Sequence, residues 1–176
     1  MKHLFLTGEI GVGKSTLLRR LLAELPGLRL GGFYSVKVAD VPGALGSVYL
    51  APPETEPVCT AEYRILVRGG PGKPPERWPQ VFETAGLSLL RDAEKADLIL
   101  MDELGKAEAA APRFCGRVLE LLAGETPVFG VLRLEGETPL QRAVRSHPQV
   151  ELVRVTAQNR DELAPLLLPR LRTMLN

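Results

Sequence analysis

The chain has 176 residues, enough for one domain with a substantial core, and we expect residues 1–176 to form a single domain. Its 22 basic and 21 acidic side chains nearly cancel, which argues against nucleic acid as a partner. No apolar run has the length of a membrane span or of a secretory signal, so we expect a cytoplasmic protein without a membrane partner. A monomer is expected. The two cysteines, Cys59 and Cys115, are expected to be reduced, partly buried packing residues.

Apolar runs alternate along the chain with amphipathic stretches, and this alternation predicts an α/β fold around a mostly parallel sheet. In chain order, we expect a strand at 3–7, a helix at 14–25, a strand at 30–38, antiparallel strands within 40–73, a loop at 71–79, a helix at 80–93, a strand at 97–101, a helix at 111–123, a strand at 127–132, a helix at 139–146, a strand at 150–155 and a helix at 160–175. The segment 40–73 is assigned to antiparallel strands because its short β-branched and aromatic pieces lie between glycine and proline clusters.

A glycine-rich stretch follows the first expected strand. It reads Gly8, Glu9, Ile10, Gly11, Val12, Gly13, Lys14, Ser15, Thr16, which matches the P-loop pattern G-x-x-x-x-G-K-S. Its place between a strand and a helix start suits phosphate, because backbone N–H groups and the helix dipole attract phosphate oxygens there. We expect Lys14 to bridge the β- and γ-phosphates of a nucleotide and Ser15 to ligate Mg²⁺.

Two carboxylates, Asp102 and Glu103, follow the apolar strand expected at 97–101. A P-loop needs a second Mg²⁺ anchor at the tip of a neighbouring strand, and Asp102 is expected to supply it. Glu103 is expected to orient and deprotonate the attacking water as a general base. Acidic pairs are also common on solvated turns. Beside a P-loop, however, the pair favours a nucleotide site that includes Leu104 and Gly105.

With both motifs in place, the chain resembles the nucleoside-triphosphatase family that includes the cancer-related nucleoside-triphosphatase of vertebrates and its thermophile relatives. The matching stretches are 5–16, 31–35, 102–108 and 156–163, together with Phe82-Glu83, in order along nearly the whole chain. The resemblance implies a three-layer, RecA-like P-loop fold with Mg²⁺-dependent hydrolysis of ATP, GTP and other nucleoside triphosphates to diphosphates. The chain departs from the family at residues 33–50, which lack its acidic and arginine residues, and at Ala107, where a methionine is usual.

Three residues near these motifs each have two interpretations. Lys106 either stabilises charge on the γ-phosphate, as an internal arginine finger would, or is a solvated lysine. In the first case, Lys106→Ala would lower turnover far more than nucleotide affinity. Asn159 either has a role in the site, as its match to the family suggests, or, as we expect, caps the last helix, with Glu162 closing a capping box. Arg160 either contacts phosphate or base, or has no role in the site.

Other side chains have mainly structural explanations. Trp78 either stacks on a nucleobase or, as we expect, anchors the 71–79 loop. The arginines Arg133, Arg142 and Arg145 are expected on a solvated helix face, with an acidic substrate pocket as the alternative.

Two other functions use the same scaffold. A small-molecule or nucleoside kinase would need an acceptor pocket and an arginine-bearing lid, for which residues 133–145 are the candidate. A GTPase switch is weakly indicated by the Asp-x-x-Gly pattern at 102–105, but 159–162 lacks the guanine-reading Asn-Lys-x-Asp pattern. The neutral charge balance disfavours a DNA-repair ATPase. Hydrolysis of nucleoside triphosphates is therefore the leading prediction.

Overall fold

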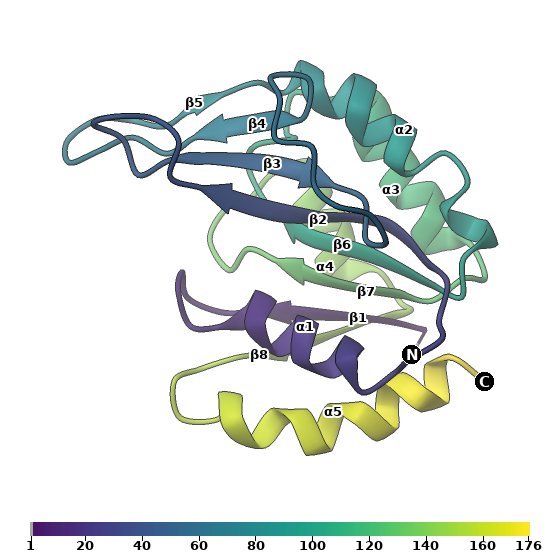
Figure 1. The fold of residues 1–176 in the computed structure, drawn as a ribbon. Helices are drawn as coiled ribbons and strands as arrows, with labels where there is room; N and C mark the ends of the chain where they lie inside the picture. Colours follow the sequence, from purple (N-terminus) through teal and green to yellow (C-terminus); the bar gives the residue numbers. More distant parts are fainter. Residues whose placement is uncertain (1) are drawn as a thin grey trace.

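The computed structural model describes residues 2–176. A single sheet of eight strands crosses the molecule in the order β5-β4-β3-β2-β6-β7-β1-β8 (Figure 1). The strands are β1 (His3–Thr7), β2 (Leu30–Val38), β3 (Ser47–Ala51), β4 (Arg64–Val67), β5 (Glu76–Arg77), β6 (Leu98–Leu104), β7 (Val128–Leu132) and β8 (Val150–Arg154). The helices are α1 (Lys14–Ala23), α2 (Leu87–Leu89), α3 (Pro112–Ala123), α4 (Pro139–Ser146) and α5 (Arg160–Met174), with a π-helical turn η1 (Phe82–Gly86) and a 3₁₀ turn η2 (Ala93–Lys95).

The sheet has a parallel half and an antiparallel half. Strands β2, β6, β7, β1 and β8 pair in parallel, whereas β3, β4 and β5 extend the sheet beyond β2 in antiparallel fashion. This confirms the predicted parallel sheet with antiparallel strands within 40–73. No helix among residues 2–176 combines the length and the apolar composition needed to cross a bilayer.

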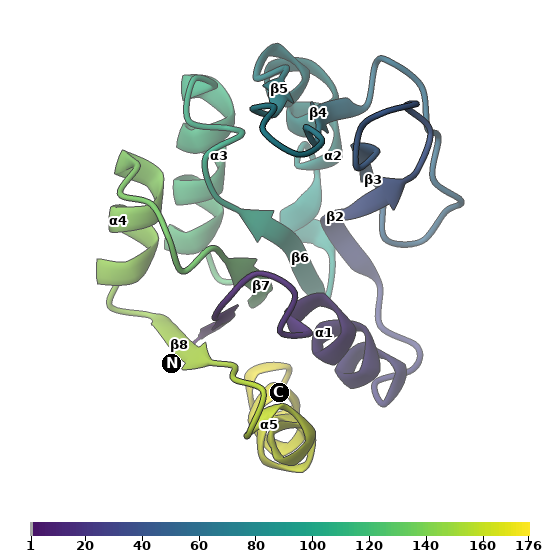
Figure 2. The same ribbon diagram turned by 90° about the vertical axis from the view of Figure 1, so that its left-hand side faces the viewer.

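Helices cover both faces of the sheet and give three layers (Figure 2). Along β1, Leu4 and Leu6 pack with α1 and α5, while Phe5 packs with the cluster on the other face, under α3 and α4. Successive side chains of a strand point to opposite faces, so a strand with helices on both sides is apolar throughout. The predicted three-layer α/β architecture is therefore confirmed.

Two segments differ from the sequence prediction. Residues 80–93 do not form one regular helix; the π-helical turn η1 and the short α2 replace it. Gly86 packs so closely that an added Cβ would lie 2.9 Å from the ring of Phe114. The stretch 71–79, expected to be a loop, contains β5. Trp78 follows β5, packs against the core and carries the guanidinium of Arg64 5.0 Å above its ring, so it anchors this stretch as expected.

The cysteine prediction is half right. Cys115 is half-buried and packs against the core, but Cys59 is exposed in the connection between β3 and β4. That connection contains many polar residues and lies outside the two apolar clusters, so it offers no core for the thiol to enter.

Candidate active site

The loop between β1 and α1 has the backbone that a phosphate cradle requires. Gly8 has a φ of 150°, and a Cβ there would lie 2.2 Å from the carbonyl oxygen of Val155. Gly13 stands at the N-cap of α1 with a φ of 104° and with no side-chain cap. The first-turn N–H groups of α1 are therefore available to an anion, and glycine is the residue that tolerates both positions.

The side chain of Lys14 folds back onto the phosphate loop and does not extend into solvent. Its side chain is buried, and its Nζ donates to the carbonyls of Gly8 at 2.8 Å and Glu9 at 2.7 Å. Burial lowers the pKa of the ammonium, and the nearby carboxylate of Glu103 opposes that shift. The charge is thus held at the mouth of the cradle, where an anion would compete with the two carbonyls for it.

The face alternation of β6 explains why Asp102 meets the loop. Leu98 and Leu100 pack toward α1 and α5, so Asp102, two residues further, points to the same face. There Ser15 Oγ donates a hydrogen bond to Asp102 Oδ1 at 2.9 Å. Asp102 is 1% exposed, and burial raises the pKa of its carboxyl.

Glu103 does not follow the alternation of side chains along β6. The pairing of β6 with β7 shifts between Asp102 and Leu104, which leaves Glu103 as an extra residue in a bulge. Such bulges re-aim a side chain at the edge of a site. The carboxylate of Glu103 is partly exposed, and its Oε1 lies 2.7 Å from Nε of Arg133, at the end of β7.

Arg133 is held in place by the backbone around it. Its N–H donates to the carbonyl of Leu104 at 2.8 Å, and its side chain crosses Gly105, where an added Cβ would lie 2.9 Å from Cδ of the arginine. Arg145 supports the same turn by donating to the carbonyls of Arg133 and Leu134 at 3.0 and 2.8 Å. The expectation of a solvated helix face is therefore wrong for Arg133, which follows strand β7, and for Arg145, which lies on helix α4 but is partly buried and binds backbone. It is confirmed for Arg142, which is exposed on α4.

A second buried acid lies beyond this ion pair. Glu108 is 1% exposed and accepts a hydrogen bond from the N–H of Gly105 at 2.5 Å. Burial raises the pKa of Glu108 to about 7. The charges of Glu103 and Arg133 act on this carboxyl in opposite directions, so burial remains the main cause of the shift.

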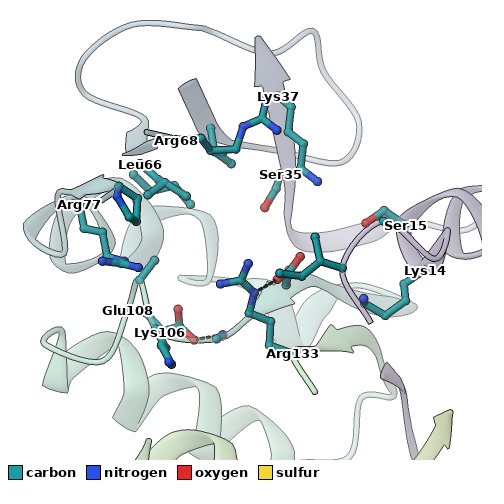
Figure 3. A pocket seen from close by; sticks show the side chains of 18 of the residues that line it. Lys14, Ser15, Ser35, Lys37, Leu66, Arg68, Arg77, Lys106, Glu108 and Arg133 are labelled. Atoms are coloured by element: carbon teal, nitrogen blue, oxygen red, sulfur yellow. Dashed lines mark hydrogen bonds and ion pairs between the residues drawn. The ribbon is translucent and has the colours of Figure 1, made fainter. Parts of the chain in front are cut away.

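These groups surround a cavity of about 470 Å³, which we call the main cavity (Figure 3). One side is formed by the phosphate loop and the segment 103–108, and the other by strands β2 to β5. In Figure 3, Arg133 lies between Lys14 on one side and Lys106 on the other. Lys106 is exposed at the cavity rim.

A second cavity lies on the other side of the phosphate loop, against the turn between β8 and α5. Arg160 lines it, with its Cδ 3.8 Å from the position that a Cβ on Gly13 would take. The predicted capping box of Asn159 with Glu162 is wrong. The side chain of Asn159 accepts from the N–H of Thr156 at 2.8 Å and donates to the carbonyl of Arg154 at 2.9 Å, so it holds this turn instead of capping the helix.

Most predicted site residues lie around these two cavities. The main cavity is lined by Ile10, Gly11, Gly13, Lys14, Ser15, Thr16, Glu103, Gly105 and Lys106, and the second by Glu9, Ile10, Gly11, Val12 and Arg160. Asp102 is buried next to Ser15, and Gly8 lies at the base of the loop. Leu104 lines neither cavity, and its side chain is buried in the core with Ile99 and Met101.

The sequence interpretation missed several residues of the main cavity. Ser35, Lys37, Arg68 and Arg77 line it from the antiparallel side, and Arg133 and Glu108 from the parallel side. Arg133 had a detectable signal, since it directly follows an apolar strand whose end is expected at the same sheet edge as Asp102. The residues of the antiparallel strands had no such signal.

The comparisons with known proteins agree over nearly the whole chain. The family described as NTPase matches residues 3–168. "Nucleoside-triphosphatase THEP1" of Methanosarcina acetivorans is 32% identical over 171 residues, which cover 93% of each chain. "Cancer-related nucleoside-triphosphatase homolog" of Mus musculus is 31% identical over 183 residues, again 93% of each.

The crystal structure of THEP1 from Aquifex aeolicus superimposes with a TM-score of 0.74 at 22% identity, over 96% of this chain and 98% of that one. The solution structure of a human cancer-related nucleoside triphosphatase gives a TM-score of 0.67 at 23% identity, over 98% of both chains. At these identities the structures establish the fold, which is that of P-loop NTPases. With the family match over residues 3–168, they confirm the resemblance seen in the motifs, and the chain belongs to the nucleoside-triphosphatase family as one of its enzymes.

Proposed function

We propose that this protein hydrolyses nucleoside triphosphates to nucleoside diphosphates and phosphate, with Mg²⁺ as its cofactor. The observation that carries the proposal is the 2.9 Å hydrogen bond between Ser15 and Asp102, which are 87 residues apart in the chain. It joins the phosphate loop to the strand-end acids at one point. The names of the relatives, which are nucleoside-triphosphatases, support the same reaction.

The residues at this point fit Mg²⁺. A hydroxyl and a carboxylate are hard oxygen ligands, and nucleotide-bound Mg²⁺ is usually held by one or two such groups together with phosphates and waters. Ser15 and Asp102 would hold the ion. Bound there, it would neutralise charge on the β- and γ-phosphates.

The other residues divide the remaining work. The N–H groups of the loop and the ammonium of Lys14 bind the phosphates. Glu103 accepts a proton from the water that attacks the γ-phosphorus, while the bond from that phosphorus to the β–γ bridging oxygen breaks and the diphosphate leaves. Arg133 holds the Glu103 carboxylate at the cavity and adds positive charge beside the phosphates. Arg160, in the second cavity, stacks on the base or contacts the phosphates from the other side of the loop.

The test is phosphate release by the purified protein from ATP, GTP, CTP and UTP with Mg²⁺ and no added acceptor. We expect turnover of all four nucleotides, and none after the metal is removed with a chelator. Lys14→Ala should weaken binding and hydrolysis together, because the ammonium contacts the ground state as well as the transition state. Glu103→Gln should keep nucleotide affinity and lower turnover about 10²- to 10⁴-fold.

Matched controls are Lys95→Ala and Glu120→Gln, which change the same residue types at exposed positions outside both cavities. Both controls should retain full turnover. Absence of phosphate release, with transfer of the γ-phosphate to an added hydroxyl acceptor, would replace hydrolysis by the kinase alternative.

A further inference from the structure

The main cavity extends well beyond the phosphate loop. Hydrolysis needs room for the γ-phosphate and one water on that side, whereas the main cavity has a volume of about 470 Å³, in the range of sites for small organic ligands. Its far side is formed by the antiparallel strands, which contribute none of the groups that the proposed hydrolysis uses. The far side therefore needs a separate explanation.

Positive charge is concentrated on that far side. Lys37, Arg68, Lys73 and Arg77 line it, and we call these four residues the basic wall. None of them forms an ion pair with a carboxylate of residues 2–176, whereas half of the other arginines in this part of the chain do. The chain as a whole carries a net charge of only +1. Unpaired cations that converge on one cavity attract anions into it.

The basic wall stands above apolar side chains. Val48 of β3 and Ile65 and Leu66 of β4 line the same part of the cavity, together with Pro75. A phosphate group alone gains nothing from such a surface, because polar oxygens lose hydration against it. Apolar lining with a few placed charges is typical of sites for organic molecules that carry charged groups.

The basic wall extends across the cavity from the phosphate loop. In Figure 3, Arg77 lies on the opposite side of the cavity from Lys14, with Arg133 between them, whereas Lys37 points toward the side of Ser15. Strand β2 is paired with β6 on one edge and with β3 on the other, so continuous hydrogen bonding holds the two sides of the cavity in one sheet. This arrangement favours two ligands side by side over one triphosphate clamped from both sides.

We propose that the basic wall binds a small organic anion, with one or two phosphate or carboxylate groups on an apolar body, while a nucleoside triphosphate occupies the phosphate loop. The second half of this statement rests on the proposed function. The anionic groups pair with the basic wall, and the apolar body lies on Val48, Ile65 and Leu66.

The probe is phenyl phosphate, which combines a dianion with an apolar ring. It is titrated by calorimetry into protein saturated with Mg²⁺ and a non-hydrolysable ATP analogue. We expect binding at one site, at least tenfold weaker binding of inorganic phosphate, and none of phenol. Arg77→Ala and Lys37→Ala, at exposed positions that do not endanger folding, should each weaken phenyl phosphate about tenfold. Arg172→Ala, an exposed cation on α5, is the matched control and should change nothing.

Two results would overturn the proposal. One is binding of phenyl phosphate that the ATP analogue abolishes, since the basic wall would then serve the triphosphate itself. The other is unchanged affinity in both Arg77→Ala and Lys37→Ala. Failure of the ATP analogue to bind would contradict the proposed function but would not by itself contradict the proposal for the basic wall. In that case, phenyl phosphate is titrated into wild type and Arg77→Ala without nucleotide. A tenfold lower affinity of Arg77→Ala would support binding at the basic wall, and equal affinity would reject it.

Discussion

The two halves of the sheet contribute differently to the main cavity. In the parallel half, β1 leads into the phosphate loop, β6 carries Asp102 and Glu103 at its end, and Arg133 follows β7. In the antiparallel half, β3, β4 and β5 form the opposite side of the cavity and carry no recognisable sequence motif. The difference follows from topology. Carboxyl ends of parallel strands meet at one edge, so residues distant in sequence converge there. Antiparallel strands alternate in direction and contribute side chains from their faces instead. The groups proposed to carry out the reaction thus lie in the parallel half, and the antiparallel half forms the other wall of the cavity.

Among substitutions that compare the two halves of the sheet, Arg133→Ala is expected to have the largest effect on turnover. The substitution removes the cation 2.7 Å from Glu103 without touching the phosphate loop. We expect kcat to fall about 10²- to 10³-fold, in the range seen when one charge-stabilising donor is removed, with nucleotide affinity almost unchanged. Steady-state kinetics and direct nucleotide titration measure the two quantities. Arg64→Ala, in the antiparallel half and outside the main cavity, should keep kcat within about twofold of wild type.

Lys106→Ala tests whether Lys106 or Arg133 stabilises the charge on the γ-phosphate. Lys106 is exposed and lies on the other side of Arg133 from Lys14 in Figure 3. A drop in kcat with Lys106→Ala and none with Arg133→Ala would assign charge stabilisation to the lysine. Equal turnover of wild type and Arg133→Ala would in any case remove Arg133 from the reaction.

Glu108→Gln tests the parallel half through stability, with a smaller effect. Burial raises the pKa of Glu108 from 4.5 to about 7, so between these pH values the folded protein binds more protons than the unfolded chain. The contribution of this carboxyl to stability is therefore complete below pH 4.5 and is lost as the pH rises to about 7. Glutamine does not titrate, and Glu108→Gln should exceed wild type by about 2 kcal/mol at pH 8 while matching it near pH 4.

Urea unfolding at the two pH values gives the comparison, with Glu120→Gln on the exposed face of α3 as the control. The same dependence of stability on pH in wild type and Glu108→Gln would show that Glu108 is ionised in the folded protein across this range.

The sequence predicts the parallel half better than the antiparallel half for physical reasons. The P-loop pattern and the apolar run before Asp102 are local signals, and the strand order that joins them follows from few alternatives. Glu103 was predicted at the site, but its pairing with Arg133 depends on a bulge in the pairing of β6 with β7, which no local pattern reveals. The same bulge turns the side chain of Leu104, which was also predicted at the site, into the core.

The antiparallel half was predicted only as strands. Lys37 lies in β2, Arg77 lies in β5, and Arg68 directly follows β4. They line one cavity because of the register between those strands. Register depends on pairing over long distances and on turns, which single-sequence patterns specify weakly. Lysines and arginines on half-exposed strands cannot be told from ordinary surface residues until it is known which strands pair with which.

The smallest effect on activity is expected from Asp40→Ala, at the turn between β2 and β3. The carboxylate of Asp40 accepts from the N–H of Ser47 at 3.0 Å and from the hydroxyl of Tyr49, so it closes this end of the hairpin. Without it, the end of the hairpin should fray, and amide exchange at Ser47 and Val48 should rise about tenfold. Nucleotide affinity and kcat should stay within about twofold, because the phosphate loop and Asp102 are held by the parallel half. Hydrogen exchange read by mass spectrometry, beside kinetics, measures both, with Asp92→Ala, at an exposed position outside both cavities, as the control. A tenfold loss of kcat in Asp40→Ala would break the contrast, since it would mean that the antiparallel half positions the reacting groups as well as the space around them.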